Sequence, residues 1–293
     1  MVRQGRITIF TGPLSFRVRS QFPDVASWLH DAYRHHPAQV DADFADFSVE
    51  VRSPLNLRRW LRPQAEFVVD GEAPFEPLPR DQAPALLEWG LNWTIAASCH
   101  QWLMIHAASL ERGGRAAILP APPGSGKSTL CASLALRDWR LLTDEMTLLD
   151  PATGLLHALA RPVNLKNQSI DIIRAFEPSA RWGPLSFDTI KGRITHLCPP
   201  EASVRQMNTP ATPAWIVFPK YVAGAEPKLT PRSKRSTFMH FAENAFNYSI
   251  LGSAGFETVG RLVRQCECYD LEYSRLEDGL EVFDWLSDPQ RDD

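Results

Sequence analysis

The sequence predicts an α/β protein in two parts: a small β-rich N-terminal subdomain over residues 1–80 and a larger α/β domain over residues 81–293. Short segments of alternating apolar and polar residues fill the first part, as is typical of strands. In the second part an apolar strand, a glycine-rich loop, a helix and another apolar strand follow one another, which is the order of a βαβ unit. With 44% hydrophobic residues in 293, the chain can bury one large core or two modest ones.

In the N-terminal part, strands are expected at residues 7–10, 16–19, 44–51 and 67–69. Three prolines between residues 74 and 79 then predict a stiff, non-helical link, because each proline fixes its own φ and restricts the residue before it. An apolar helix is expected over residues 85–104. It contains Glu88 and Asn92 and therefore suits a buried core helix better than a membrane span.

In the second part the apolar patterns predict five strands and four helices. The strands are expected at residues 105–110, 116–119, 139–143, 215–218 and 267–273, and the helices at 127–137, 238–251, 256–266 and 277–286.

Composition excludes several classes of protein. A net charge of -3 without a long basic run argues against nonspecific binding of nucleic acid. Residues 1–10 alternate rather than forming an apolar signal segment, so we expect a soluble, cytoplasmic protein without a membrane partner. The five cysteines are scattered without the paired spacing of a zinc site, which predicts free thiols.

The segment Pro-Ala-Pro-Pro-Gly-Ser-Gly-Lys-Ser-Thr at residues 120–129 lies between a predicted strand and a predicted helix, which is typical of a loop that binds nucleotide phosphates. Lys127 can contact the β and γ phosphates of ATP, and Ser128 occupies the usual Mg²⁺ position. Ala121 replaces the first glycine of the usual pattern, and two prolines follow it. The expected nucleotide-binding residues are Pro123, Gly124, Ser125, Gly126, Lys127, Ser128 and Thr129.

Asp144 and Glu145 directly follow the apolar strand predicted at residues 139–143. A parallel crossover would bring the end of this strand beside the phosphate loop. Two carboxylates there can bind Mg²⁺ or accept a proton from an attacking hydroxyl. The structural alternative is that Asp144 caps a helix and Glu145 is solvated.

The order His106, Gly-Ser-Gly-Lys-Ser at residues 124–128 and Arg-Leu-Leu-Thr-Asp-Glu at residues 140–145 resembles the catalytic domain of bacterial HPr kinase/phosphorylase, and more closely the type A HPr-kinase-related kinases. Segments 161–167, 214–219, 242–248 and 268–273 extend the resemblance over most of the chain. The resemblance implies a P-loop domain of the HPr kinase/PEP carboxykinase-like type.

The resemblance also implies roles for individual residues. Asp144 matches the acid that acts as base toward a serine hydroxyl, and His106 matches the histidine that orients the acid pair. Glu145 stands where that family has aspartate, so its side chain is one methylene longer. By its residue type alone, a histidine at a strand edge is more often structural.

Three further cations are candidates for contacting the transferred phosphoryl group or the substrate: Arg161, Lys166 and Arg193. Arg161 and Lys166 lie in a polar segment after the strand that precedes the acids, and Arg193 ends a Lys-Gly-Arg loop. A solvated surface position is the alternative for Arg161 and Lys166, and a mobile loop without a role in binding is the alternative for Arg193.

These observations predict an ATP- and Mg²⁺-dependent kinase that transfers the γ-phosphoryl group to a serine of a protein or peptide. The resemblance favours a modified-peptide precursor as acceptor, with a small peptide-carrier protein as partner, and self-association. A nucleotide-dependent switch or ATPase, in which Glu145 positions water, and a small-molecule kinase are the alternatives, because the loop does not specify the receiving hydroxyl.

Overall fold

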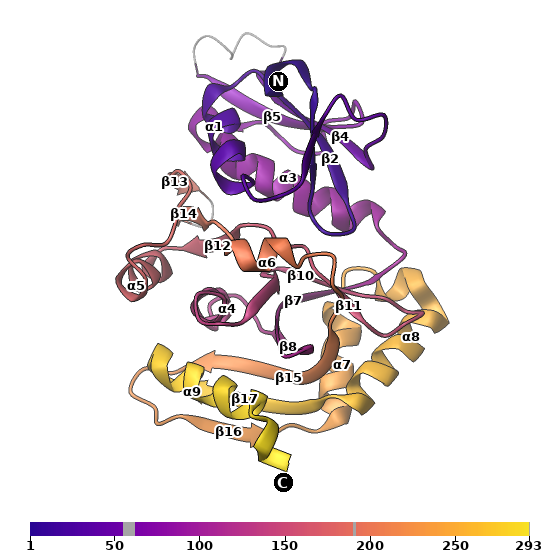
Figure 1. The fold of residues 1–293 in the computed structure, drawn as a ribbon, viewed down its shortest axis with the longest axis vertical. Helices are drawn as coiled ribbons and strands as arrows, with labels where there is room; N and C mark the ends of the chain where they lie inside the picture. Colours follow the sequence, from indigo (N-terminus) through magenta and orange to yellow (C-terminus); the bar gives the residue numbers. More distant parts are fainter. Residues whose placement is uncertain (55–61, 190–191, 293) are drawn as a thin grey trace.

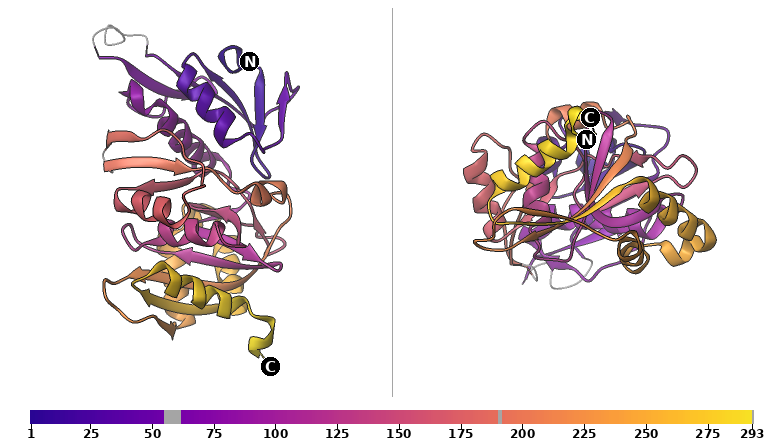
Figure 2. Two further views of the ribbon diagram at one scale, coloured as in Figure 1. Left: turned by 60° about the vertical axis from the view of Figure 1, so that its left-hand side comes forward. Right: turned by 90° about the horizontal axis from the view of Figure 1, so that it is seen from below.

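The computed structural model describes residues 1–54, 62–189 and 192–292, and its fold is mixed α/β. Within these residues the strands form sheets of six, eight and three strands. Figures 1 and 2 show the N- and C-termini at opposite ends of the long axis, with the N-terminal sheet at one end and β16 and β17 near the other.

The six-stranded N-terminal sheet has the order β3-β1-β2-β4-β5-β6, and within it only β2 and β4 pair in parallel. The four strands predicted in this part of the chain are present as β1, β2, β4 and β5. Its elements are β1 (Ile7–Phe10), β2 (Ser15–Ser20), α1 (Pro23–Ala32), β3 (Ala38–Val40), β4 (Phe47–Arg52), β5 (Gln64–Val69) and β6 (Leu78–Pro79). The sequence did not predict α1, β3 or the two-residue strand β6, which lies in the segment predicted as a proline link.

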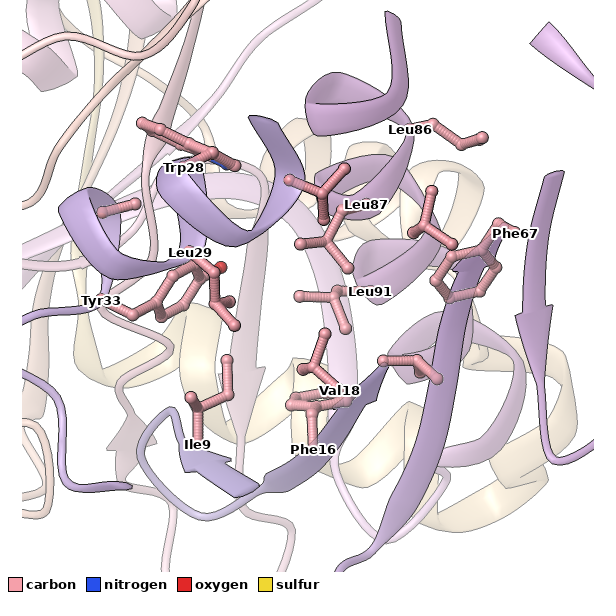
Figure 3. Close-up of a cluster of buried hydrophobic side chains, with 14 of the residues drawn as sticks. Ile9, Phe16, Val18, Trp28, Leu29, Tyr33, Phe67, Leu86, Leu87 and Leu91 are labelled. Carbon is pink, nitrogen blue, oxygen red and sulfur yellow. The ribbon is translucent and has the colours of Figure 1, made fainter. Parts of the chain in front are cut away.

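Two helices cover one face of this sheet: α1 and α3 (Ala83–Ser98). Figure 3 shows Phe16 and Val18 of the sheet facing Leu87 and Leu91 of α3 across a buried cluster. Gly90 of α3 lies so close to the sheet that a Cβ atom would fall 2.3 Å from the ring of Phe67. The predicted helix over residues 85–104 was too long, because the chain leaves the helix after Ser98 and continues as β7.

The eight-stranded sheet has the order β11-β10-β7-β8-β15-β17-β16, with β9 beside β7. Its strands are β7 (Leu103–Arg112), β8 (Arg115–Pro120), β9 (Arg140–Thr143), β10 (Met146–Leu149), β11 (Leu156–His157), β15 (Thr212–Tyr221), β16 (Lys228–Pro231) and β17 (Glu267–Tyr273). The five strands predicted in this part of the chain are all present.

The predicted crossover runs from β8 through α4 (Lys127–Ala135) to β9. β9 does not pair with β8: both are antiparallel to β7, which lies between them. β8 and β9 therefore run in the same direction, and their carboxyl ends, followed by the glycine-rich loop and by Asp144, reach the same edge of the sheet. This placement brings the two motifs together.

The remaining elements pack around this sheet (Figure 1). They are β12 (Val163–Lys166), α5 (Gln168–Phe176), β13 (Ser186–Thr189), β14 (Gly192–Leu197), α6 (Glu201–Arg205), α7 (Lys234–Asn244), α8 (Tyr248–Gln265) and α9 (Leu276–Ser287), with short 3₁₀ turns at Val2–Gln4, Arg80–Gln82 and Pro289–Asp292. The two helices predicted at 238–251 and 256–266 are present as α7 and α8, but the break between them lies elsewhere. The chain leaves the helix between Asn244 and Tyr248, and α8 has only a kink at Gly252. Among the described helices, none has both the length and the apolar composition needed to cross a lipid bilayer.

Candidate active site

The glycine-rich loop connects β8 to α4, and the ends of two other strands hold its shape. The backbone N–H of Tyr221 on β15 donates to the Ser125 carbonyl at 2.9 Å, and the Tyr273 hydroxyl on β17 donates to the Gly126 carbonyl at 3.4 Å. Gly126 has φ +90°, and a Cβ atom there would fall 2.8 Å from the Tyr273 hydroxyl. Both the backbone conformation and the contact therefore require glycine.

Helix α4 begins at Lys127, directly after Gly126, which has no side chain to cap it. The N–H groups of a first helical turn have no partner within the helix, so they carry partial positive charge toward whatever lies in front of them. In front of this turn lies a cavity of about 540 Å³. All seven residues predicted to bind nucleotide line it: Pro123, Gly124, Ser125, Gly126, Lys127, Ser128 and Thr129.

Asp144 and Glu145 lie at the break between β9 and β10 and line the same cavity. The Lys127 ammonium donates to the backbone carbonyl of Asp144 at 2.6 Å. The Asn164 N–H donates to Asp144 Oδ2 at 3.1 Å. Asp144 Oδ1 is buried and has no hydrogen-bond partner among the described residues. The loop and the acid pair therefore meet as the strand order predicted.

Burial raises the pKa of Asp144 above its usual range, and the like charge of Glu145 adds to the effect. Lys127, the Ser128 hydroxyl and the Asn164 N–H act in the opposite direction by stabilising the carboxylate. A carboxylate whose charge is only partly compensated has a higher affinity for a proton or a cation. This environment suits Asp144 to accept a proton.

His106 and Lys166 line the same cavity as the acids. His106 lies on β7 opposite Met146, so the strand pairing carries it to the acid pair, and its ring centroid is 5.6 Å from that of Phe246. Lys166 is the last residue of β12.

Arg161 and Arg193 do not line this cavity. Arg161 is buried and forms an ion pair with Glu88 at 2.9 Å, beside a small polar cavity that it shares with Asp144 and Glu145. Arg193 forms an ion pair with Asp171. Lys191, which precedes it in the predicted Lys-Gly-Arg loop, lies outside the described residues.

Four polar residues that the sequence did not indicate as site residues also line the cavity in front of α4: Asn164, Asn167, Gln168 and Ser169. Ser125 Oγ and Asn164 Oδ1 resemble Asp144 Oδ1 in being buried without a hydrogen-bond partner among the described residues. These three atoms are available to form hydrogen bonds with a polar ligand bound in the cavity.

Two further cavities adjoin the loop. One of about 620 Å³ shares Gly124, Gly126, Thr129 and the start of α5 with the cavity in front of α4. It is otherwise lined by the rest of α5, by Tyr221 and Tyr273, and by the chain after β17. Another of about 690 Å³ borders Ala121 and Ser125 on the side of β16.

The acid pair does not form a dedicated metal cage. The described residues contain no group of three or more His, Cys, Asp or Glu side chains placed to hold a metal ion. A cation here would be bound by two carboxylates and the Ser128 hydroxyl, and would take its other ligands from a bound substrate or from water, as Mg²⁺ commonly does.

No protein-family model matches the chain, and no curated protein matches it significantly.

Proposed function

We propose that this protein is a P-loop kinase that uses Mg²⁺ and ATP to phosphorylate a serine hydroxyl of a protein or peptide. The observation that carries the proposal is the convergence of a helix N-terminus, Lys127 and the Asp144–Glu145 pair on one cavity. Positive groups on one wall and carboxylates on the other are what phosphoryl transfer requires.

The loop would bind the triphosphate. Its backbone N–H groups and those of the first turn of α4 would donate to the phosphate oxygens, and Lys127 would neutralise charge toward the γ phosphate. The adjoining cavity, lined by Tyr221, Tyr273, Ile172 and Phe176, suits a purine ring because aromatic and aliphatic side chains can stack on its faces.

Asp144, Glu145 and Ser128 fit Mg²⁺ because all three offer oxygen ligands and Asp144 Oδ1 is buried without a partner among the described residues. When bound, the ion would offset charge on the phosphate oxygens. Asp144 would take the proton from the serine hydroxyl as the serine oxygen bonds to the γ phosphorus, while the bond from phosphorus to the bridging oxygen breaks and ADP leaves with that electron pair.

A serine acceptor on a protein or peptide is supported by the resemblance to the HPr-kinase-related kinases, which includes His106 and the acid pair. If the purine occupies the cavity beside Thr129, the acceptor would enter from the His106 side, where the exposed ring of Phe246 lies against His106.

Incubation with Mg-ATP labelled at the γ phosphate tests the proposal. Mass spectrometry of added serine-containing peptides should locate the phosphate. Asp144→Asn should retain nucleotide binding but lower phosphotransfer by roughly 10²–10⁴-fold, the contribution of a general base. Label released only as free phosphate would instead support a hydrolase, and full transfer by Asp144→Asn would show that another group is the base.

A further inference from the structure

Glu145 contacts a residue that belongs to neither the loop nor its sheet. The side-chain amide of Asn92 donates from Nδ2 to Glu145 Oε2 at 3.2 Å. Asn92 lies on α3, the helix that packs on the N-terminal sheet. One carboxylate of the acid pair is therefore held from the N-terminal side of the molecule.

The orientation of the Asn92 amide is fixed by Arg161. Arg161 Nη1 donates to Asn92 Oδ1 at 2.7 Å. Because a guanidinium can only donate hydrogen bonds, the amide oxygen must face Arg161 and the amide NH₂ must face Glu145. Arg161 thus determines which group of Asn92 reaches the acid.

Arg161 is itself held in place. Its Nη2 atom donates to the Glu88 carboxylate and to the Glu88 carbonyl, each at 2.9 Å. Glu88 is 2% exposed and also accepts hydrogen bonds from the indole of Trp28 on α1 at 3.0 Å and from the hydroxyl of Tyr33, the residue after α1, at 2.9 Å. A buried ion pair with this many hydrogen bonds has little freedom to rearrange.

We propose that Asn92 and Arg161 are positioning residues that hold the Glu145 carboxylate in place for the metal-nucleotide complex. The N-terminal helices would then complete the active site instead of forming a separate module. The inference rests on the proposed function and accounts for glutamate at position 145, because an aspartate would withdraw its oxygens from Asn92 by about 1.5 Å, the length of one carbon–carbon bond.

The competing explanation is that the network only stabilises the fold, and Asn92→Asp separates the two. Aspartate keeps the size of Asn92 and gives Arg161 a stronger acceptor, so a structural role would be preserved. It removes the donor to Glu145 and places a like charge there, so a positioning role would be lost.

The measurement is the Mg²⁺ concentration at half-maximal binding of a fluorescent ATP analogue, with the melting temperature of each variant in parallel. Loss of a group that orients a metal ligand typically costs about 10–100-fold in metal affinity. Asn92→Asp should raise the half-saturating Mg²⁺ concentration by about tenfold or more without lowering the melting temperature. Glu145→Asp should do the same, and the double variant should be no worse than the more affected single variant.

An Mg²⁺ requirement in Asn92→Asp equal to that of the wild type, or below it because the new carboxylate attracts the cation, would overturn this inference and leave the kinase proposal standing. Additive effects in the double variant would overturn it too, since Asn92 would then act independently of Glu145. Failure of the wild-type protein to bind the analogue at any Mg²⁺ concentration would overturn both proposals. The conservative variant Arg161→Lys should resemble Asn92→Asp in its Mg²⁺ requirement, because lysine lacks the fork that contacts Glu88 and Asn92 together.

Discussion

Asp144, which lines the cavity, combines features that do not stabilise the fold. Asp144 is 7% exposed, its pKa is raised by burial, and one of its oxygens has no hydrogen-bond partner among the described residues. A polar atom buried in this way costs free energy. Such costs are typical of sites selected for function rather than for stability.

Lys127 provides the most direct test at the scale of one residue. Lys127→Met removes the ammonium and keeps the length and much of the apolar character of the side chain. A hydrogen bond to a charged group contributes about 1.5–3 kcal/mol, so nucleotide affinity should fall by roughly 10–100-fold. Equilibrium titration with the fluorescent ATP analogue measures this. Arg205→Met, at an exposed position on α6, is the control and should bind like the wild type. Equal affinity in Lys127→Met and the wild type would show that Lys127 does not contact the nucleotide.

At the scale of elements, the sequence was most informative where a segment carries its own periodicity. The predicted ranges 7–10 and 267–273 coincide with β1 and β17. Helix α1 was not predicted, although Val25, Trp28, Leu29 and Ala32 have helical spacing and are buried. The alternating segments on both sides of it predict a β-rich region and obscure this short helical pattern.

Contacts between distant segments explain the rest of what was missed. No local pattern encodes the insertion of β7 between β8 and β9, or the contact of Asn92 with Glu145, which lies 53 residues further along the chain. The loop and the acids could be found because each is a short motif. The hydrogen-bond network of Asn92, Arg161 and Glu88 could not be predicted in this way. Glu88 within an apolar helix was nevertheless a signal that a buried partner was needed.

The loop between β8 and α4 makes a prediction at this scale. Gly124 and Gly126 both have positive φ, but a Cβ atom at Gly124 would meet nothing within 4 Å, whereas one at Gly126 would fall 2.8 Å from the Tyr273 hydroxyl. Gly124→Ala should therefore cost only the backbone strain of about 1–2 kcal/mol. Gly126→Ala should destabilise the protein further and also weaken nucleotide binding.

Urea unfolding and nucleotide titration of both variants would measure the difference. Adding Tyr273→Phe to Gly126→Ala removes the hydroxyl that the new methyl group meets and should recover part of the loss, with Tyr273→Phe alone as reference. Equal losses in Gly124→Ala and Gly126→Ala, or no recovery in the double variant, would show that β17 does not constrain the loop.

For the whole molecule, the main question is how the N-terminal sheet relates to the cavity. The sequence placed a division near residue 80, and α3, which begins at Ala83, packs on the N-terminal sheet while its Asn92 reaches Glu145. A second contact lies nearby: the His36 ring, buried beyond the end of α1, hydrogen-bonds through Nε2 to the Ala160 carbonyl at 2.9 Å. The two parts are therefore joined through buried polar groups, and their joint stability should depend on pH.

Burial lowers the pKa of His36 from its ordinary value of 6.5 to about 4; the Ala160 carbonyl and Glu88 oppose the shift, and Arg161 and His35 add to it. Between these two pH values the unfolded chain binds a proton at His36 that the folded protein does not. Stability contributed by neutral His36 is therefore fully present above pH 6.5 and is lost as pH falls toward 4. One pKa unit corresponds to about 1.4 kcal/mol, so the loss should reach roughly 2 kcal/mol by pH 5.

His36→Gln keeps a group able to donate to the Ala160 carbonyl and cannot take up a proton. Urea unfolding of the wild type and this variant between pH 7.5 and 5 should show the wild type losing roughly 2 kcal/mol relative to the variant. Titration of carboxylates, which affects both proteins, cancels in this difference. His30→Gln, an exposed position on α1, is the control and should follow the wild type. A constant difference between the wild type and His36→Gln across this range would mean that the folded protein admits the proton, and that the junction at Ala160 opens to water more readily than its burial implies.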